Sequence, residues 1–270
     1  MSLGRLALWV VAVLTMIFLL APIVVIIAVS FNSTALFTFP PPHWSIRWYA
    51  SLLESRSWRE AGTFSVTLAC LVAMAALTLG VPAAYGLARD RFRGRKFIEG
   101  LLISPMIVPA IVLALGLYML FSPLRLIGTP FGLFLAHTLL ALPIVVIIVG
   151  AACQRLDTSI EFAARSCGAS FAKAFSFVVL PALRPAIISA GAFAFLTSFD
   201  EVVLNLFLGG PSTTTLPRKI WESVKFELDP TLTAVSTVLI AVSIAALLVT
   251  TVARRRAPAR IAAHDPAEAQ

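Results

Sequence analysis

Long apolar runs alternate along this chain with short connections that carry most of its charged residues. Six runs are long enough to be membrane helices, because a helix needs roughly 20 mostly apolar residues to cross the hydrocarbon core. They cover about residues 6–30, 61–88, 97–120, 130–150, 186–208 and 232–252. The first run is longer than the roughly 7–15 apolar residues of a signal peptide, so we expect it to be retained as a helix. Because the number of runs is even, both termini are predicted to share one side of the membrane.

The connection between the fourth and fifth runs is too long to be a simple turn. It comprises about thirty residues, CQRLDTSIEFAARSCGASFAKAFSFVVLPALRP, where helix connections in bundles need roughly 2–8. Either Asp157 or Thr158 is expected to cap a helix over residues 158–167 by accepting backbone N–H bonds. Residues 156–185 are therefore predicted to have a structure of their own, which we call the elbow.

Gly168 is expected to divide the elbow into two arms. A glycine permits a left-handed or otherwise tight backbone, so the first helix is predicted to end there and a second to leave at a sharp angle. The second helix is expected over residues 170–179, closed by Leu180 and Pro181. The small residues Ala163 and Ala164 in the first arm would allow close approach by another protein.

Composition agrees with a membrane protein. With 59% hydrophobic residues, 13% charged residues and a mean hydropathy of +0.95, the chain has too little polar surface for a soluble globule. The formal net charge is +8, but the basic residues lie in short connections rather than on one stripe, which favours the membrane surface over nucleic acid as a partner.

The basic residues also predict the orientation. Fourteen of the 21 Lys and Arg residues fall on one side of the predicted topology and seven on the other. Because Lys and Arg collect on the cytosolic side of membrane proteins, both termini and the connections 89–96 and 151–185 are predicted to be cytosolic.

Two adjacent carboxylates, Asp200 and Glu201, interrupt the fifth apolar run. Asp200 lies about fifteen residues beyond the elbow, roughly 22 Å along a helix, which would place the pair in the outer half of the membrane. A carboxylate at the bilayer centre costs roughly 2.5–3.5 kcal/mol on insertion scales, so neither is expected to face lipid. On a continuous helix Thr197, Glu201 and Asn205 would share one polar stripe, with Asp200 about 100° to its side.

Three interpretations of the carboxylates stay open. They pair with Arg or Lys of a neighbouring subunit or meet water at the interface, they belong to a proton relay, or at least one of them lines a path for a cationic solute. In the last case they would supply counter-charge to ammonium groups where water is scarce.

The elbow resembles a signature of the membrane-spanning permease subunits of bacterial ATP-binding-cassette (ABC) importers. That signature reads Glu-Ala-Ala, three residues, Gly, nine residues, Ile-x-Leu-Pro. This chain matches its spacing, with Val in place of Ile, at Ala163, Ala164, Gly168, Val178, Leu180 and Pro181. The resemblance implies that these residues dock into a groove of a cytosolic ATPase.

One position departs from the signature. Phe162 occupies the place of its glutamate, and the acid stands one residue earlier at Glu161. One residue turns a helix by roughly 100°, so Glu161 is not expected to take over the usual polar role. Phe162 is expected to fill the ATPase groove by apolar packing instead.

The resemblance extends over most of the chain. The segments SFNSTALFTFPPPHWSIRWYASLL, PAAYGLARDRFRGRK and SPMIVPAIVLALGLYML are similar to permeases of the polyamine and opine-like branch. The segment SFDEVVLNLFLGGPSTTTLPRKIWESVKF looks most like spermidine and putrescine permeases.

The resemblance implies an all-α integral membrane fold of the type I importer permeases, with one domain over residues 1–270 and a disordered tail over about 257–270. It implies a bacterial inner-membrane protein that works with a homologous second permease, a pair of cytosolic ATPases and an external solute-binding protein. The expected cargo is a small cationic solute such as spermidine or putrescine, with another amine or an opine-type solute as the alternative.

No enzyme site is visible in the sequence. The phosphate-binding pattern GxxxxGK[ST] is absent, so ATP and Mg²⁺ are expected to be used by the partner ATPase, and no cofactor or metal by this chain. The histidines, His43, His137 and His264, lie far apart, and His137 is expected to be a packing or helix-contact residue. A secondary transporter or channel that needs no ATP, or an inactive scaffold, remains the rival interpretation.

Overall fold

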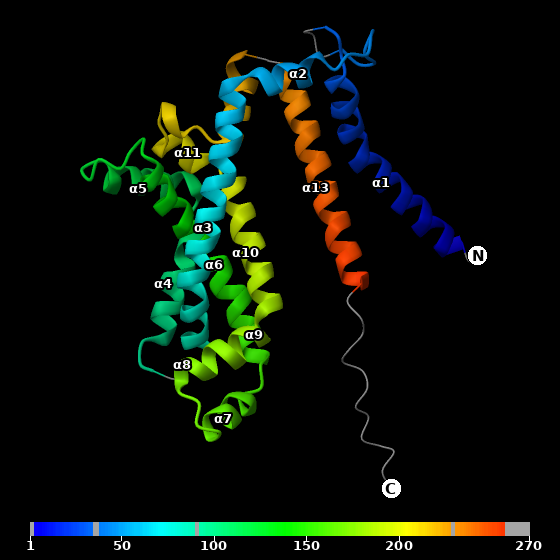
Figure 1. The fold of residues 1–270 in the computed structure, drawn as a ribbon. Helices are drawn as coiled ribbons and strands as arrows, with labels where there is room; N and C mark the ends of the chain where they lie inside the picture. The colour runs from blue at the N-terminus through cyan, green and yellow to red at the C-terminus, as the bar shows by residue number, and fades with distance from the viewer. Residues whose placement is uncertain (1–2, 35–37, 90–91, 228–229, 257–270) are drawn as a thin grey trace. The chain divides into compact units, whose positions relative to one another are not determined.

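The computed structural model describes residues 3–34, 38–89, 92–227 and 230–256, with side chains as far as residue 245. This part of the chain is helical and contains no β-strand, only an isolated antiparallel bridge between Asn32 and Trp44. It divides into two compact units, one made of Met1–Ser55 with Ser223–Gln270 and the other of Arg56–Glu222. Figure 1 shows the helices of both units. The all-α fold expected from the apolar runs is confirmed.

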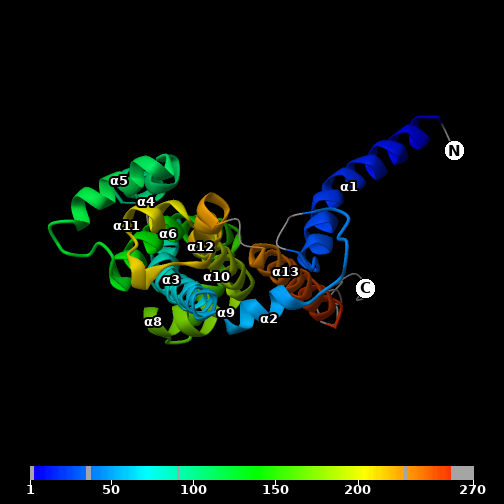
Figure 2. The ribbon, with the colours of Figure 1, turned by 90° about the horizontal axis from the view of Figure 1, so that it is seen from above.

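Three long helices form the core of the second unit. They are α3 (Arg56–Arg89), α6 (Pro130–Arg155) and α10 (Arg184–Phe199), which pack side by side (Figures 1 and 2). Small residues allow their backbones to approach closely, as is common in membrane helix pairs. A Cβ atom on Gly80 of α3 would lie 2.7 Å from a side-chain carbon of Val145 on α6, so only glycine fits there.

The start of α6 has a visible cause in the sequence. Thr129 precedes it, and its Oγ1 accepts the backbone N–H of Gly132 at 3.0 Å, while Pro130 occupies the first helical position, where no N–H is needed. The helix runs to Arg155, a few residues beyond the predicted end at 150.

The third apolar run, 97–120, was expected to be one helix, and this expectation is wrong. It forms α4 (Arg95–Ile107) and α5 (Ala110–Phe121), which are bent by 107° relative to each other. The break lies at Val108, which is extended (φ −72°, ψ 132°), and Pro109. A proline lacks a backbone N–H and disfavours helical geometry in the residue before it, so the helix ends at this point.

The fifth apolar run, 186–208, is also interrupted. Helix α10 ends at Phe199, and a short helix, α11 (Val203–Leu208), follows after a break at residues 200–202. The chain then forms a 3-10 turn, η2 (Pro211–Thr213), and a helix, α12 (Leu216–Glu222). The expected polar stripe on a continuous helix therefore does not exist.

The first unit contains α1 (Leu3–Ser30), α2 (Arg47–Glu54), a π-helical turn η3 (Ser223–Glu227) and α13 (Thr231–Arg256). Helix α13 contacts both α1 and α2. The indole of Trp48 on α2 donates a 2.8 Å hydrogen bond to the carbonyl of Asn32, which fastens α2 to the chain that follows α1. The apolar side chains of α1 are exposed, with Phe18 at 76%, which suits a helix surrounded by lipid.

Several described helices are long and apolar enough to cross a membrane. Three meet this test alone, namely α1, α3 and α6, and the described residues offer up to five spans if each of two bent pairs is one span. The second bent pair joins the elbow to α10. The expected number of six spans and the single domain over residues 1–270 stay predictions, and the expected disordered tail at 257–270 lies outside the described residues.

Candidate functional site: the elbow and the acidic segment

The first arm of the elbow is α7 (Ser159–Ser166), within one residue of its predicted bounds at each end. Asp157 provides the cap, since its Oδ1 accepts the N–H of Ser159 at 2.9 Å and the side chain of Thr158 makes no capping bond. Hydrogen bonds from Ser159 stabilise the carboxylate and lower the pKa of Asp157. Gly168 ends the arm with φ +89°, the left-handed conformation that favours glycine.

The second arm continues further than predicted. It consists of α8 (Phe171–Ala174), a π-helical turn η1 (Phe175–Val179) and α9 (Leu180–Ala182). Leu180 and Pro181 do not close it, because the Leu180 N–H bonds to the carbonyl of Phe175, five residues back. This wider π-helical turn directly precedes Pro181, which has no backbone N–H and so cannot donate the next α-helical hydrogen bond. The chain then bends by 74° between α9 and α10.

Apolar contacts seat the second arm on the end of α3. Tyr85 of α3 lies edge-on to Phe175 of the elbow, with ring centroids 4.9 Å apart, and 6.1 Å from the ring of Phe171. Val179 and Leu183 are buried in the same core. The elbow is therefore packed against the long helices of the second unit.

An ionic contact holds the first arm. Nε of Arg89, the last residue of α3, lies 4.0 Å from Oε2 of Glu161, and the two side chains are only 15% and 12% exposed. The same guanidinium donates from Nη2 to the carbonyl of Leu156 at 3.1 Å. Arg89 thus joins the end of α3 to both the end of α6 and α7. The sequence had marked Arg89 only as one of the cytosolic charges, and nothing in its pattern identified its partner.

Because Glu161 and Phe162 are adjacent on α7, their side chains point in different directions. Glu161 is turned toward the protein, whereas Phe162 is 62% exposed. No residue of α7, Ala163 and Ala164 included, is buried. Large apolar side chains are exposed along the elbow at Ile160, Phe162, Phe171 and Phe177. Exposed apolar clusters of this kind mark contact surfaces for other proteins.

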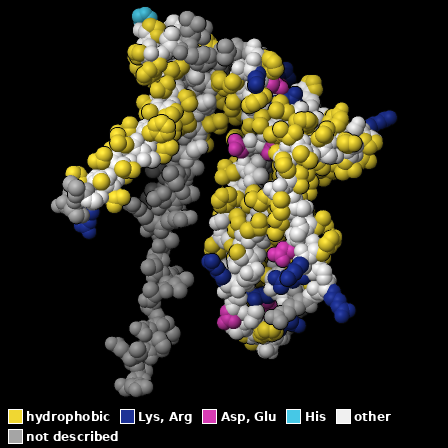
Figure 3. Space-filling view, turned by 180° about the vertical axis from the view of Figure 1, so that it is seen from behind, with side chains coloured by type: hydrophobic (Ala, Val, Ile, Leu, Met, Phe, Trp, Pro, Cys, Tyr) yellow, Lys and Arg dark blue, Asp and Glu magenta, His cyan; other side chains and the backbone are white. Residues whose placement is uncertain are grey.

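Basic side chains surround this end of the second unit. Figure 3 shows Lys and Arg side chains gathered toward the end that carries the elbow. They belong to the end of α3, the start of α4, the end of α6 and the elbow itself, and include Arg93, Arg95, Lys96, Arg155, Arg165 and Lys173.

In the acidic segment, which comprises residues 197–205, the two carboxylates have different surroundings. Glu201 Oε1 accepts the N–H of Leu204 at 2.9 Å, so it caps the start of α11. Asp200 follows the last residue of α10, and its backbone N–H donates to the carbonyl of Leu196. Its side chain is exposed. In the described part of the chain, no hydrogen bond or ion pair engages the Asp200 carboxylate.

The other two predicted pathway residues are engaged in the fold. Asn205 is fully buried, and its side-chain amide donates to the backbone carbonyl of Thr213 at 2.9 Å. The backbone carbonyl of Asn205 accepts a hydrogen bond from Nη1 of Arg218 at 3.2 Å. The hydroxyl of Thr197 donates to the carbonyl of Phe193 in the preceding turn of α10. Among the four residues predicted to line the solute path, only Asp200 has an exposed side chain without a hydrogen bond or ion pair to the described part of the chain.

His137 makes the helix contact expected of it. Its Nδ1 lies 3.0 Å from Oγ of Ser198, so the pair links α6 to α10, and both side chains are buried. Across the described residues, no group of three or more His, Cys, Asp or Glu side chains is placed to hold a metal ion.

Comparison with known proteins adds the family context. Residues 76–258 match the family model described as binding-protein-dependent transport system inner membrane component. The putrescine transport system permease protein PotI of Escherichia coli (strain K12) is 36% identical over 230 residues, which are 83% of this chain and 82% of that protein. The spermidine/putrescine transport system permease protein PotC of the same strain is 34% identical over 227 residues, 84% of this chain and 86% of that protein.

A solved structure has the same fold. It is the crystal structure of a bacterial ABC transporter involved in the import of the acidic polysaccharide alginate, with a TM-score of 0.73. The match covers 95% of this chain and 98% of that chain at 20% sequence identity. At this identity the likeness concerns the fold alone.

Proposed function

Because the chain belongs to the family of inner membrane components of binding-protein-dependent transport systems, we propose that its cargo is a polyamine such as putrescine or spermidine. It is a transport subunit rather than an enzyme. The observation that carries the substrate proposal is the 34–36% identity to permeases named for putrescine and spermidine, spread over more than four fifths of this chain.

The partners follow from the same relationship. A second, homologous permease would complete the path, a pair of ATPases would use ATP and Mg²⁺, and an external binding protein would deliver the solute. The exposed apolar side chains of the elbow, with Phe162 foremost, support it as the surface where an ATPase docks. Its packing against α3 and α6 would pass the ATPase movement to the long helices.

Asp200 supports a cationic cargo. Its exposed carboxylate follows the end of α10, where it can offer counter-charge to an ammonium group. Glu201, Thr197 and Asn205 would act by shaping this segment, because their side chains bond within the chain.

For the orientation, the excess of basic residues on one side supports cytosolic termini and a cytosolic elbow. The elbow would then meet ATPases in the cytosol, and the acidic segment would lie nearer the external side.

The experiment is to measure ATP hydrolysis by the complete importer with its binding protein and a series of solutes. Putrescine or spermidine is expected to stimulate hydrolysis, and a neutral or acidic solute such as an alginate oligosaccharide is not. Stimulation by an opine or an amino acid, but by no polyamine, would reject the substrate and leave the family assignment intact.

A further inference from the structure

A small cavity lies at the elbow end of the second unit, between α3, α4 and α6. Its volume is about 200 Å³. Most of its wall is apolar or small, and its lining residues are Ala84, Leu87, Ala88, Arg95, Glu99, Ile103, Val146, Ile147, Gly150, Ala151 and Gln154. None of these residues belongs to the elbow or to the acidic segment, so the cavity is separate from both.

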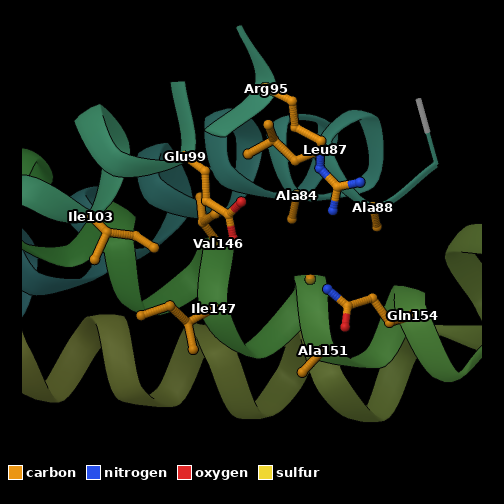
Figure 4. Close-up of a pocket in the computed structure, with 11 residues that line it drawn as sticks. Ala84, Leu87, Ala88, Arg95, Glu99, Ile103, Val146, Ile147, Ala151 and Gln154 are labelled. Carbon is orange, nitrogen blue, oxygen red and sulfur yellow. The ribbon is translucent and has the colours of Figure 1, made fainter. Parts of the chain in front are cut away.

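Three polar side chains enter this apolar space. Figure 4 shows Arg95 and Glu99 reaching in from α4 and Gln154 from α6. Arg95 and Glu99 are four residues apart, so they lie on one face of α4, about 6 Å apart along its axis. Considering only the residues that the structure describes, none of the three side chains makes a hydrogen bond or an ion pair.

Arg95 and Glu99 are half-buried charges of opposite sign, so together they can hold a ligand that carries the complementary charges. A carboxylate and a guanidinium in a partly apolar cavity lose hydration, which costs free energy unless each meets an opposite charge or a hydrogen-bonding group. The complementary ligand carries an ammonium group for Glu99, an anionic group for Arg95, and a hydrogen-bonding group for Gln154.

The apolar part of the cavity indicates which class of ligand fits it. Ile103 and Ile147 lie at the end of the cavity away from Arg95 and Gln154 (Figure 4). Exposed apolar side chains continue from this end: Ile147 is 43% exposed, and Ile107, one turn after Ile103 on the same side of α4, is 77% exposed. A ligand with a charged head and an apolar tail fits both features, because its tail can leave the cavity along this surface.

The size agrees with a head group rather than a whole molecule. Pockets for drug-sized ligands have volumes of about 300–1,000 Å³, so a cavity of about 200 Å³ admits only part of such a ligand. We propose that this cavity binds the head group of a zwitterionic phospholipid, with the ammonium at Glu99 and the phosphate at Arg95, as in phosphatidylethanolamine.

The test measures lipid binding to the purified complete importer by native mass spectrometry after delipidation. Phosphatidylethanolamine is expected to bind once for each copy of this chain. Glu99→Gln should weaken this binding roughly tenfold or more, the usual effect of losing a hydrogen bond to a charged group. Phosphatidylglycerol, which lacks the ammonium, should bind wild-type protein less tightly, and Glu99→Gln should not weaken its binding.

Two further variants separate the cavity from general charge effects. Arg95→Gln should weaken binding of both lipids, whereas Lys96→Gln, which removes the same charge one residue away, should not. Ala151→Leu keeps every charge and fills the space, so it should also abolish binding. Assembly of each variant is checked by size-exclusion chromatography, and Glu54→Gln on the exposed part of α2 is the control for Glu99→Gln.

The outcomes decide the proposal without any transport assay. Equal binding of phosphatidylethanolamine to wild-type, Glu99→Gln and Ala151→Leu importers would overturn it. Free phosphoethanolamine tests the source of the head group: if it binds as tightly as the lipid, the ligand is a soluble zwitterion and the lipid proposal is rejected. Weak competition by free phosphoethanolamine, with lipid binding lost in Glu99→Gln, supports it.

Discussion

Among single residues, Glu161 and Phe162 show how an offset of one position places two side chains in different surroundings. On α7 the carboxylate meets Arg89, and the phenyl ring remains exposed. The sequence indicated that Glu161 would not replace the glutamate of the family signature, since one residue rotates the side chain by roughly 100°. It could not indicate Arg89 as the partner, because that contact depends on how α3 packs beside the elbow.

A double-mutant cycle tests this contact. Arg89→Gln and Glu161→Gln should each reduce the number of solute molecules imported per ATP hydrolysed, because the first arm is then held less firmly to α3. The double variant should lose less than the sum of the two single variants, because the two side chains contact each other. The measurement is the ratio of uptake to ATP hydrolysis in proteoliposomes.

Additive losses in this cycle would mean that the two side chains act independently. Arg93→Gln, which removes a nearby charge of the same end of the unit, serves as the control and should leave the ratio unchanged.

Asp200 is the second residue with a testable role. If its carboxylate meets an ammonium group of the cargo, Asp200→Asn should lower the apparent affinity for putrescine roughly tenfold, the scale of a lost charged hydrogen bond. Glu201→Gln should have a smaller effect, because its amide oxygen can still accept the N–H of Leu204. The measurement is the concentration dependence of initial uptake rates.

Asp157→Asn makes the same chemical change at the elbow and keeps an acceptor for Ser159, so its affinity for putrescine should match that of the wild type. Unaltered affinity in Asp200→Asn would remove this residue from the solute path.

Among the elements, the sequence identified helices better than breaks. The helix at 158–167 and the turn at Gly168 were predictable, since a capping Asp and a glycine with positive φ are local signals. The bend at Val108–Pro109 had a signal too, the proline, but an apolar run on both sides hid it. The break after Phe199 has neither glycine nor proline, and the hydrogen bond that Glu201 accepts from the N–H of Leu204 at the start of α11 has no such local signal.

The elbow surface offers a prediction about docking. Phe162→Ala should weaken binding of the ATPase about tenfold, because a large exposed aromatic side chain is the kind of residue that dominates protein interfaces. The control is Phe97→Ala on α4, where the phenylalanine is 75% exposed, against 62% for Phe162, but lies outside the elbow. Co-purification of the ATPase at increasing salt and detergent measures the effect, and equal losses in both variants would contradict a docking role for Phe162.

At the scale of the whole molecule, the all-α membrane fold was predictable from the apolar runs. A segment inside the bilayer finds no water, so its backbone N–H and C=O groups must form hydrogen bonds with one another, as they do in a helix. The number of spans was less predictable, because α4 and α5 are bent by 107° relative to each other and the second arm of the elbow is bent by 74° relative to α10. Runs of apolar residues report that a segment avoids water, whereas bends depend on backbone hydrogen bonds within and between helices.

The orientation can be tested with one cysteine. Cys167 is exposed in the elbow, whereas Cys153 is buried. In a Cys70→Ser, Cys153→Ser variant without the ATPase, a membrane-impermeant maleimide should label Cys167 in inside-out vesicles and spare it in right-side-out vesicles. The reverse pattern would place the elbow outside the cell and contradict the orientation from the basic residues.

The most direct test of the central claim is the initial rate of putrescine uptake into proteoliposomes that hold the complete importer, with and without ATP on the ATPase side. Uptake should require ATP and the ATPase, and should continue when the proton gradient is collapsed. Uptake of putrescine that persists without the ATPase, or that follows the proton gradient, would contradict an ATP-driven polyamine importer.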